Sequence, residues 1–140
     1  MQRKGSAVWK GGLKDGNGQV STGSGGLQAA PYTFASRFES GGKTDPEELI
    51  AAAHAACFSM AFSGQLGQAN LKPESIATTA TVTLEKTDAG MTITAVHLAV
   101  KARVPGADRA AFDKAANNAK TGCPISRLLN AKITLEAVLE

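Results

Sequence analysis

The sequence contains few aromatic residues, with one Trp, one Tyr and five Phe in 140 residues. Proteins that bind nucleic acids usually combine a basic stripe with aromatic side chains on which bases stack. The 15 lysines and arginines are spread along the chain, and the formal net charge is only +3. We therefore expect no nucleic-acid partner.

The sequence also lacks the features of an exported or membrane-spanning protein. Its first residues, MQRKGSAVWKGG, are basic but contain no apolar segment with a small-residue cleavage site. The apolar run from Leu49 to Gln65 is internal, rich in alanine and shorter than a bilayer requires. We expect a cytoplasmic protein with no membrane segment, and in the reducing cytosol its two cysteines should not form a permanent structural bridge.

The length and the order of the predicted elements indicate one α+β domain covering residues 1–140. Alternating apolar residues predict strands, Gly/Asp/Asn clusters predict turns, and residues 41–43 (GGK) interrupt the pattern. The expected strands cover residues 6–10, 18–22, 33–38, 75–88, 91–104 and 131–140, and the expected helices cover residues 44–65, 109–120 and 124–130. This order predicts two antiparallel β-sheets around a long central helix.

The predicted helix after residue 43 has strong start signals and an unusual composition. Thr44 or Asp45 can cap it, Thr44 with Glu47 fits a capping box, and the acidic first turn complements the helix dipole. The helix is apolar nearly all round, which is typical of a helix at the centre of a domain or against a partner subunit. The expected apolar stripe, with Cys57 beside it, consists of Leu49, Ala53, Ala56 and Met60.

The two cysteines are the main candidates for chemistry. Cys57 taken alone could be an inert core residue. The helix predicted over residues 109–120 should stop at Gly122, as a C′ residue just beyond its end. Cys123 directly precedes Pro124 at the predicted start of a short helix, where the N–H groups and dipole favour a thiolate. Capping or burial is an equally good interpretation of Cys123.

His54 precedes Cys57 by three residues, so the two side chains are neighbours on one helix face. This spacing permits a His-activated nucleophile, half of a zinc site, or a purely structural histidine. The sequence has no CxxC or HxxxH spacing. We therefore expect no metal and no cofactor, and the role of His54 stays open.

Three segments together resemble the OsmC branch of the OsmC/Ohr family of thiol peroxidases: TDPEELIAAAHAACFSMA, AKTGCPISRLL, and RFE twenty residues before the first cysteine. The resemblance extends over essentially the whole chain. It implies an intertwined homodimer with active sites at the subunit interface, which reduces organic hydroperoxides to alcohols in oxidative or osmotic stress defence. It also implies roles for four residues: Cys57 as nucleophile, Cys123 as resolving cysteine, Arg37 as the site arginine and Glu47 as the site glutamate.

The chemistry of these residue types agrees with the implied roles. A cysteine in an apolar helix needs a cation to ionise near neutral pH, and the forked guanidinium of Arg37 can hold both thiolate and peroxide while Glu47 orients it. The Cys57 sulfenic acid would condense with Cys123 to a disulfide, which an external dithiol reduces. The resemblance points to a lipoyl-bearing protein as that dithiol.

Two other functional classes compete with a peroxidase. A thiol–disulfide oxidoreductase normally uses CxxC, whereas these cysteines are 66 residues apart. A non-catalytic dimeric binding protein would leave Arg37 and Glu47 without a role.

The helical rise places Glu47 roughly 15 Å from Cys57 along one helix. Glu47 therefore acts through Arg37, or the helix begins later, or Glu47 acts on the partner's cysteine. The apolar helix favours the third of these alternatives.

Overall fold

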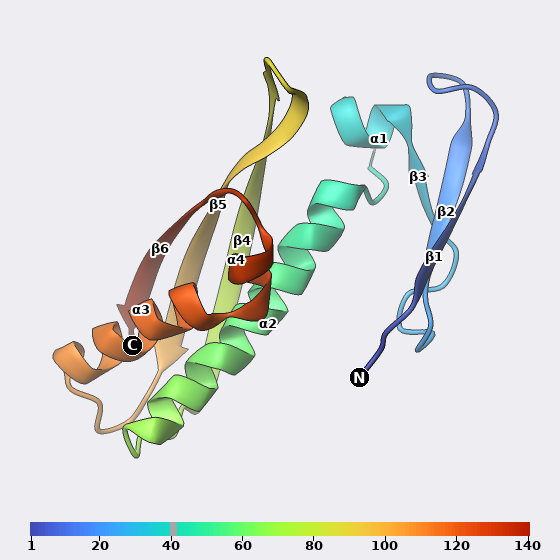
Figure 1. The fold of residues 1–140 in the computed structure, drawn as a ribbon. Helices are drawn as coiled ribbons and strands as arrows, with labels where there is room; N and C mark the ends of the chain where they lie inside the picture. Colours follow the sequence, from blue (N-terminus) through green and yellow to red (C-terminus); the bar gives the residue numbers. More distant parts are fainter. Residues whose placement is uncertain (40–41) are drawn as a thin grey trace. The chain divides into compact units, whose positions relative to one another are not determined.

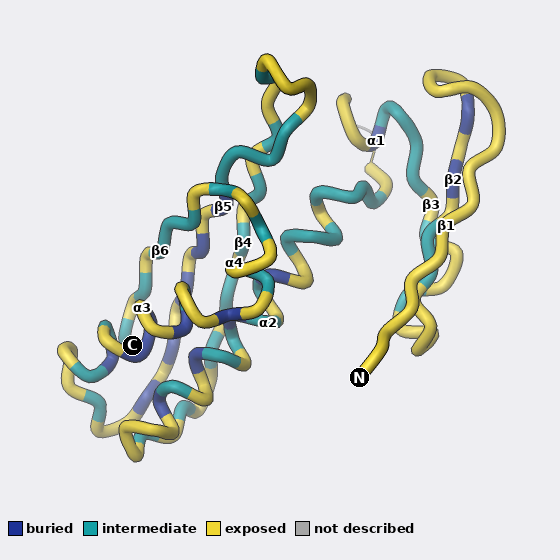
Figure 2. Tube along the Cα trace, viewed as in Figure 1, coloured by how far each residue is buried: buried dark blue, intermediate teal, exposed yellow. Residues whose placement is uncertain are grey.

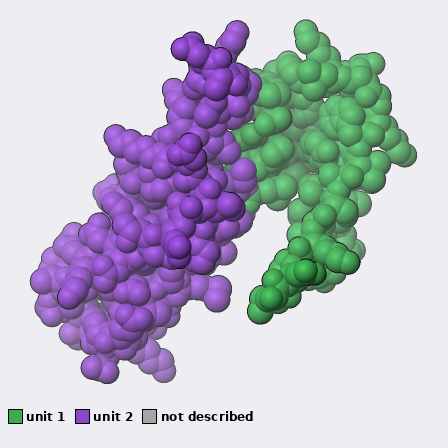
Figure 3. Space-filling view, in the orientation of Figure 1, with its two compact units in different colours: residues 1–49 green, residues 50–140 purple. Residues whose placement is uncertain are grey.

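The computed structural model describes residues 1–39 and 42–140. The chain divides into two compact units, Met1–Leu49 and Ile50–Glu140 (Figure 3). Each unit contains a three-stranded sheet, and the elements combine helices and strands as an α+β fold requires.

The first unit is built on an antiparallel sheet in the order β1-β2-β3 (Figure 1). Its strands are β1 (Gly5–Lys10), β2 (Asn17–Thr22) and β3 (Ala30–Thr33). Gly18 on β2 lies between two aromatic rings, since an added Cβ would stand 2.5 Å from Tyr32 and 2.8 Å from Trp9. Glycine at this position allows the two rings to pack with their centroids 5.4 Å apart.

The structure corrects the prediction of a strand over residues 33–38. Residues Phe34–Phe38 form a short helix, α1, because Thr33 and Ser36 cap each other. The Ser36 N–H donates to Thr33 Oγ1 (3.1 Å) and the Thr33 N–H donates to Ser36 Oγ (2.9 Å). Phe34 and Phe38 still share one face, with centroids 4.8 Å apart, because helical residues four apart are neighbours. The break expected at residues 41–43 lies partly outside the described residues.

Helix α2 (Pro46–Gln68) starts as the sequence predicts, with Asp45 as the cap. The Glu48 N–H donates to Asp45 Oδ1 at 2.8 Å, whereas the Thr44 hydroxyl donates to the Glu48 carboxylate at 2.7 Å. The expected Thr44–Glu47 capping box is therefore replaced by this arrangement.

The buried face of α2 differs from the predicted stripe. The buried residues recur at every fourth position: His54, Phe58, Phe62 and Leu66. Met60, a member of the predicted stripe, is 79% exposed. Two phenylalanines bury more apolar area than a row of alanines, and this difference determines which face turns inward.

Helix α2 is also the one described helix that is long and apolar enough to cross a membrane by length and composition. Core helices of soluble proteins pass the same test, so this is weak evidence for a membrane span.

The second unit contains a mixed sheet in the order β4-β5-β6. Strands β4 (Ser75–Thr87) and β5 (Gly90–Arg103) form the predicted antiparallel hairpin. Strand β6 (Lys132–Leu139) joins the hairpin as predicted but runs parallel to β5, so the prediction of two antiparallel sheets is wrong for this pair. The reason is that α3 (Arg109–Gly122) and α4 (Pro124–Leu128) return the chain to the end of the sheet at which β5 begins, so β6 runs in the same direction as β5.

The core of the second unit lies between β5, α2 and α3. Alternate residues of β5 are buried and appear dark blue in Figure 2, and Phe62 of α2 meets Phe112 of α3 edge to face at 5.2 Å. Cys123 belongs to this core and is fully buried. It follows Gly122, which is the last residue of α3 and not, as predicted, a residue beyond its end.

Candidate active site

The two cysteine sulfurs lie 2.8 Å apart, although the residues are 66 positions apart in the sequence. Cys57 comes from α2 and is partly exposed, whereas Cys123 is fully buried. Both are free thiols. The two sulfurs are within reach of each other for disulfide formation, and Cys57 is the more exposed of the two.

The position of Cys123 follows from the junction of two helices. Cys123 is the C-cap of α3 and also the N-cap of α4. Its N–H donates to the Ala119 carbonyl at 2.9 Å, and Pro124 occupies the first position of α4, where a missing N–H costs nothing. The chain therefore turns at Cys123 while its side chain stays in the core.

Opposing effects act on the ionisation of Cys57. Burial raises the pKa of the Cys57 thiol most, and the hydrogen bond with the neighbouring Cys123 thiol raises it further. The Ile125 backbone N–H lowers the same pKa by hydrogen bonding to the sulfur. The start of α4, which we expected to act on Cys123, thus supplies a donor to Cys57.

Arg37 and Glu47 form an ion pair within the first unit. Arg37 Nε donates to both Glu47 oxygens (3.0 and 3.2 Å), and Nη2 donates to Oε1 at 2.7 Å. The Glu47 carboxylate raises the pKa of Arg37, so the guanidinium stays charged. The Glu47 side chain is only 13% exposed, and the Arg37 guanidinium lies 5.1 Å from the centre of the Phe38 ring. These contacts restrict the orientation of the guanidinium.

A pocket of about 270 Å³ lies beside Arg37 in the first unit. Its walls are mostly apolar and are formed by Trp9, Leu13, Tyr32, Thr33, Phe34, Phe38 and Pro46. Phe58 and Phe62, the phenylalanines nearest Cys57 along α2, are fully buried core residues.

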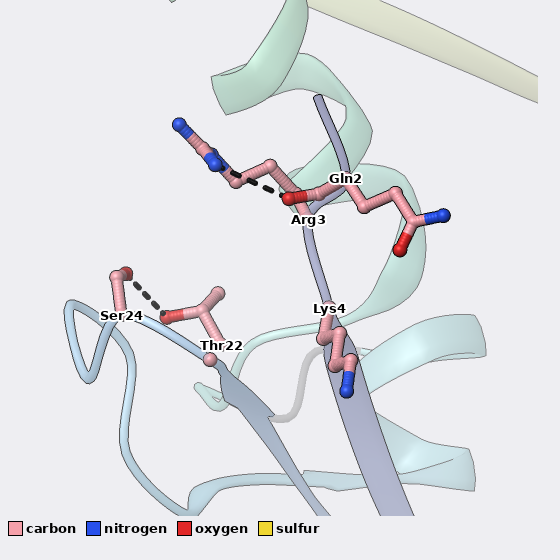
Figure 4. Close-up of a pocket in the computed structure, with 6 residues that line it drawn as sticks. Gln2, Arg3, Lys4, Thr22 and Ser24 are labelled. Carbon is pink, nitrogen blue, oxygen red and sulfur yellow. Dashed lines mark hydrogen bonds between the residues drawn. The ribbon is translucent and has the colours of Figure 1, made fainter.

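A larger hollow of about 720 Å³ lies between the N-terminal segment and the turn after β2 (Figure 4). Among its lining residues, Arg3 donates to the Gln2 carbonyl at 3.2 Å and the hydroxyls of Thr22 and Ser24 lie 3.4 Å apart. These residues are exposed, and the four predicted site residues lie elsewhere in the chain.

The structure thus brings the predicted site residues together as two pairs, one in each unit. Arg37 pairs with Glu47, and Cys57 pairs with Cys123. Sequence reasoning missed the contribution of Ile125, since a backbone N–H leaves no trace in the residue type. Within residues 1–39 and 42–140, no group of three or more His, Cys, Asp or Glu side chains is placed to hold a metal ion.

Comparison with known proteins decides the family. The family model described as "OsmC-like protein" matches residues 39–138. The chain belongs to this family. It is 52% identical to "Peroxiredoxin OsmC" of Escherichia coli (strain K12) over 140 residues, covering 100% of this chain and 98% of the relative, and equally similar to "Peroxiredoxin OsmC" of Shigella flexneri.

Solved structures of the family have the same fold. The organic hydroperoxide resistance protein OhrB of Bacillus subtilis matches with a TM-score of 0.72 at 24% identity, covering 98% of both chains. An OsmC described as an organic hydroperoxide resistance protein from Legionella pneumophila matches with a TM-score of 0.71 at 26% identity, covering 96% of both chains. The prediction of an OsmC-like α+β fold is confirmed, and the protein is a thiol peroxidase with an antioxidant role.

The Ile125 N–H provides a test of the electrostatics at Cys57. In a Cys123→Ser background, where Cys57 is the only thiol, Ile125→Pro should move the pH midpoint of Cys57 alkylation upward. The substitution removes a donor that favours the thiolate. Ile125→Val keeps the N–H and serves as the control. Equal midpoints in the two variants would show that this N–H does not act on Cys57.

Proposed function

We propose that this protein reduces organic hydroperoxides to alcohols, with Cys57 as the nucleophile and Cys123 as the resolving cysteine. The observation that carries the proposal is the 2.8 Å separation of the two sulfurs. The assignment of the two roles follows from exposure, because Cys57 is partly exposed and Cys123 is fully buried.

The Cys57 thiolate attacks one oxygen of the hydroperoxide. A sulfur–oxygen bond forms, the O–O bond breaks, and the alkoxide leaves and takes up a proton to become the alcohol. Cys57 is left as a sulfenic acid, having supplied the two electrons that reduce the peroxide. Cys123 then attacks the sulfenic sulfur, which forms a disulfide and releases water.

An external dithiol returns the enzyme to its starting state. Its thiolate attacks the Cys57–Cys123 disulfide to form a mixed disulfide, and its second thiol completes the exchange. Both protein cysteines become thiols and the reductant becomes a disulfide. We propose a lipoyl-bearing protein as the dithiol, on the family resemblance alone.

Arg37 is proposed to stabilise the Cys57 thiolate and the departing alkoxide. A guanidinium can donate to sulfur and to a peroxide oxygen at the same time, and such aligned donors stabilise developing charge in a transition state. Glu47 is proposed to hold this guanidinium in position. The proposal is supported by the three hydrogen bonds between their side chains and by the burial of Glu47.

The apolar pocket beside Arg37 supports an organic substrate over hydrogen peroxide. Aromatic and aliphatic side chains line it, including Trp9, Leu13 and Phe38. A hydroperoxide carrying an alkyl or aryl group would bury apolar surface there, which hydrogen peroxide does not have. The OhrB and Legionella proteins, which are named for organic hydroperoxide resistance, point to the same class of compound.

We further propose that the protein acts in the cytoplasm as a homodimer with shared active sites, each chain contributing one OsmC-like domain of residues 1–140. The face of α2 that carries Met60, Ala53 and Ala56 is exposed in a single chain. A second copy would cover this apolar face, and interfaces of obligate dimers are large and apolar. In the shared site, Arg37 and Glu47 of one chain would serve Cys57 of the other.

Replacing each cysteine should separate the two steps of the reaction. Cys57→Ser should abolish peroxidase turnover and leave no sulfenic acid to trap. Cys123→Ser should react once with cumene hydroperoxide, accumulate sulfenic acid at Cys57 and lose most dithiol-dependent turnover. Peroxide consumption with a small dithiol, compared between cumene hydroperoxide and hydrogen peroxide, is the assay. Near-normal activity in Cys57→Ser would refute the assignment, and disulfide exchange without peroxide consumption would indicate a thiol–disulfide oxidoreductase.

Arg37→Ala should raise the pKa of Cys57 and lower kcat/KM for the hydroperoxide roughly hundredfold, the usual effect of losing one stabilising donor. Arg37→Lys should restore the activity only in part, since lysine keeps the charge but loses the fork. Arg109→Ala is a matched control, because Arg109 makes a similar ion pair with Asp113 on the exposed face of α3. An unchanged alkylation profile in Arg37→Ala would remove Arg37 from the mechanism.

Subunit mixing should test the shared site. A Glu47→Ala chain and a Cys57→Ser chain, each inactive alone, are mixed under conditions that exchange subunits. If the sites are shared, one of the two sites in each heterodimer has both residues intact, so activity should return. Heterodimers confirmed by mass spectrometry but lacking activity would contradict the shared site.

A further inference from the structure

His54 is a buried titratable residue that the mechanism above does not use. It is fully buried on α2, one turn before Cys57. Its Nε2 lies 2.7 Å from the Ser126 hydroxyl of α4. The other ring nitrogen, Nδ1, is buried and has no hydrogen-bond partner among the described residues.

The hydrogen bond to Ser126 is therefore the one polar contact described for this ring. Burial lowers the pKa of His54, so the ring is neutral near neutral pH. A neutral imidazole has one donor and one acceptor nitrogen, and the serine hydroxyl can satisfy either of them. A buried polar group that loses its partner pays the full cost of desolvation, so this hydrogen bond restrains both residues.

Helix α4 has little else to hold it in place. It is five residues long, all five keep some exposure, and Leu128 is 74% exposed. A helix this short does not form on its own and depends on tertiary contacts. Ile125 packs against the edge of the core, and the neighbouring Ser126 forms the hydrogen bond to α2.

Both ends of this hydrogen bond lie next to reacting groups. His54 is three residues before Cys57, and Ser126 is three residues after Cys123. Ser126 also directly follows Ile125, whose backbone N–H lowers the pKa of Cys57. Movement of α4 away from α2 would therefore shift the resolving thiol and this N–H together.

We propose that His54 is a positioning residue for the resolving step: through Ser126 it holds α4 against α2 and keeps the Cys123 sulfur in line with the Cys57 sulfenic acid. The inference rests on the proposed order of the two cysteines. Formation of the sulfenic acid needs only the Cys57 thiolate and the hydroperoxide. Formation of the disulfide needs Cys123 to meet the S–O bond in the right orientation, and such steps are sensitive to small displacements.

A slow resolving step has a chemical consequence. A second hydroperoxide molecule can transfer an oxygen atom to the waiting sulfenic acid, which gives a sulfinic acid at Cys57 and a second alcohol. The His54–Ser126 hydrogen bond therefore also limits overoxidation of the enzyme.

The test is single-turnover oxidation of Ser126→Ala by cumene hydroperoxide. Sulfenic acid is trapped with dimedone, the disulfide and sulfinic acid are measured by mass spectrometry, and the pH is set above the alkylation midpoint of Cys57 in every variant. Disulfide formation should slow roughly tenfold, in line with the loss of a buried hydrogen bond. Sulfenic acid formation should stay within about twofold of the wild type, and the sulfinic acid yield should rise.

Further variants separate positioning from general destabilisation. Ser126→Thr keeps the hydroxyl and should restore most of the disulfide rate. Ser59→Ala is the matched control, because it removes a 2.8 Å hydroxyl pair that joins α2 to Thr78 of β4 and not to α4. The double variant His54→Leu/Ser126→Ala leaves no unpaired polar group, so it should fold well while disulfide formation stays slow.

Equal slowing of both oxidation steps, or a wild-type disulfide rate in a folded Ser126→Ala or double variant, would overturn the proposal. Failure of the proposed function has a different signature. In that case the wild-type protein itself would form no sulfenic acid at Cys57 or no Cys57–Cys123 disulfide.

Discussion

The buried face of α2 is the constraint on which the second unit depends. Three of its residues, Phe58, Phe62 and Leu66, belong to the core that β5 and α3 complete, and Phe62 meets Phe112 edge to face. Once this face is turned inward, Cys57 lies at its edge, partly buried and next to Cys123. The opposite face, which carries Met60, stays exposed.

The second cysteine lies in the helical connection between β5 and β6. Helices α3 and α4 return the chain so that β6 lies parallel to β5, and the junction between the two helices is Cys123. This residue is buried in the core, and the Ser126 hydroxyl of α4 lies 2.7 Å from His54 of α2. The segment that makes β6 parallel to β5 therefore also carries the second cysteine.

The chemistry of a thiol peroxidase needs both an ionised sulfur and a stabilised leaving oxygen. Burial opposes ionisation of Cys57, and the Ile125 N–H favours it. The first unit holds a guanidinium whose orientation is restricted by Glu47 and whose neighbours form an apolar pocket. In the proposed mechanism the charge of Arg37 stabilises the thiolate and the leaving oxygen, and this pocket binds the organic group of the substrate. The two cysteines alone provide neither.

The sequence by itself determined the elements whose signals are local: the hairpin of β4 and β5, the start of α2 after Thr44 or Asp45, and the motifs around Cys57 and Cys123 that place the chain in its family. The alternating pattern of residues 33–38 predicted a strand, but these residues form α1. The reciprocal cap between Thr33 and Ser36 outweighs an alternating pattern in so short a segment. Only the tertiary structure decided which face of α2 is buried and that β6 runs parallel to β5. It also decided that His54 meets Ser126, since contacts across 72 residues depend on how whole elements pack and not on any local pattern.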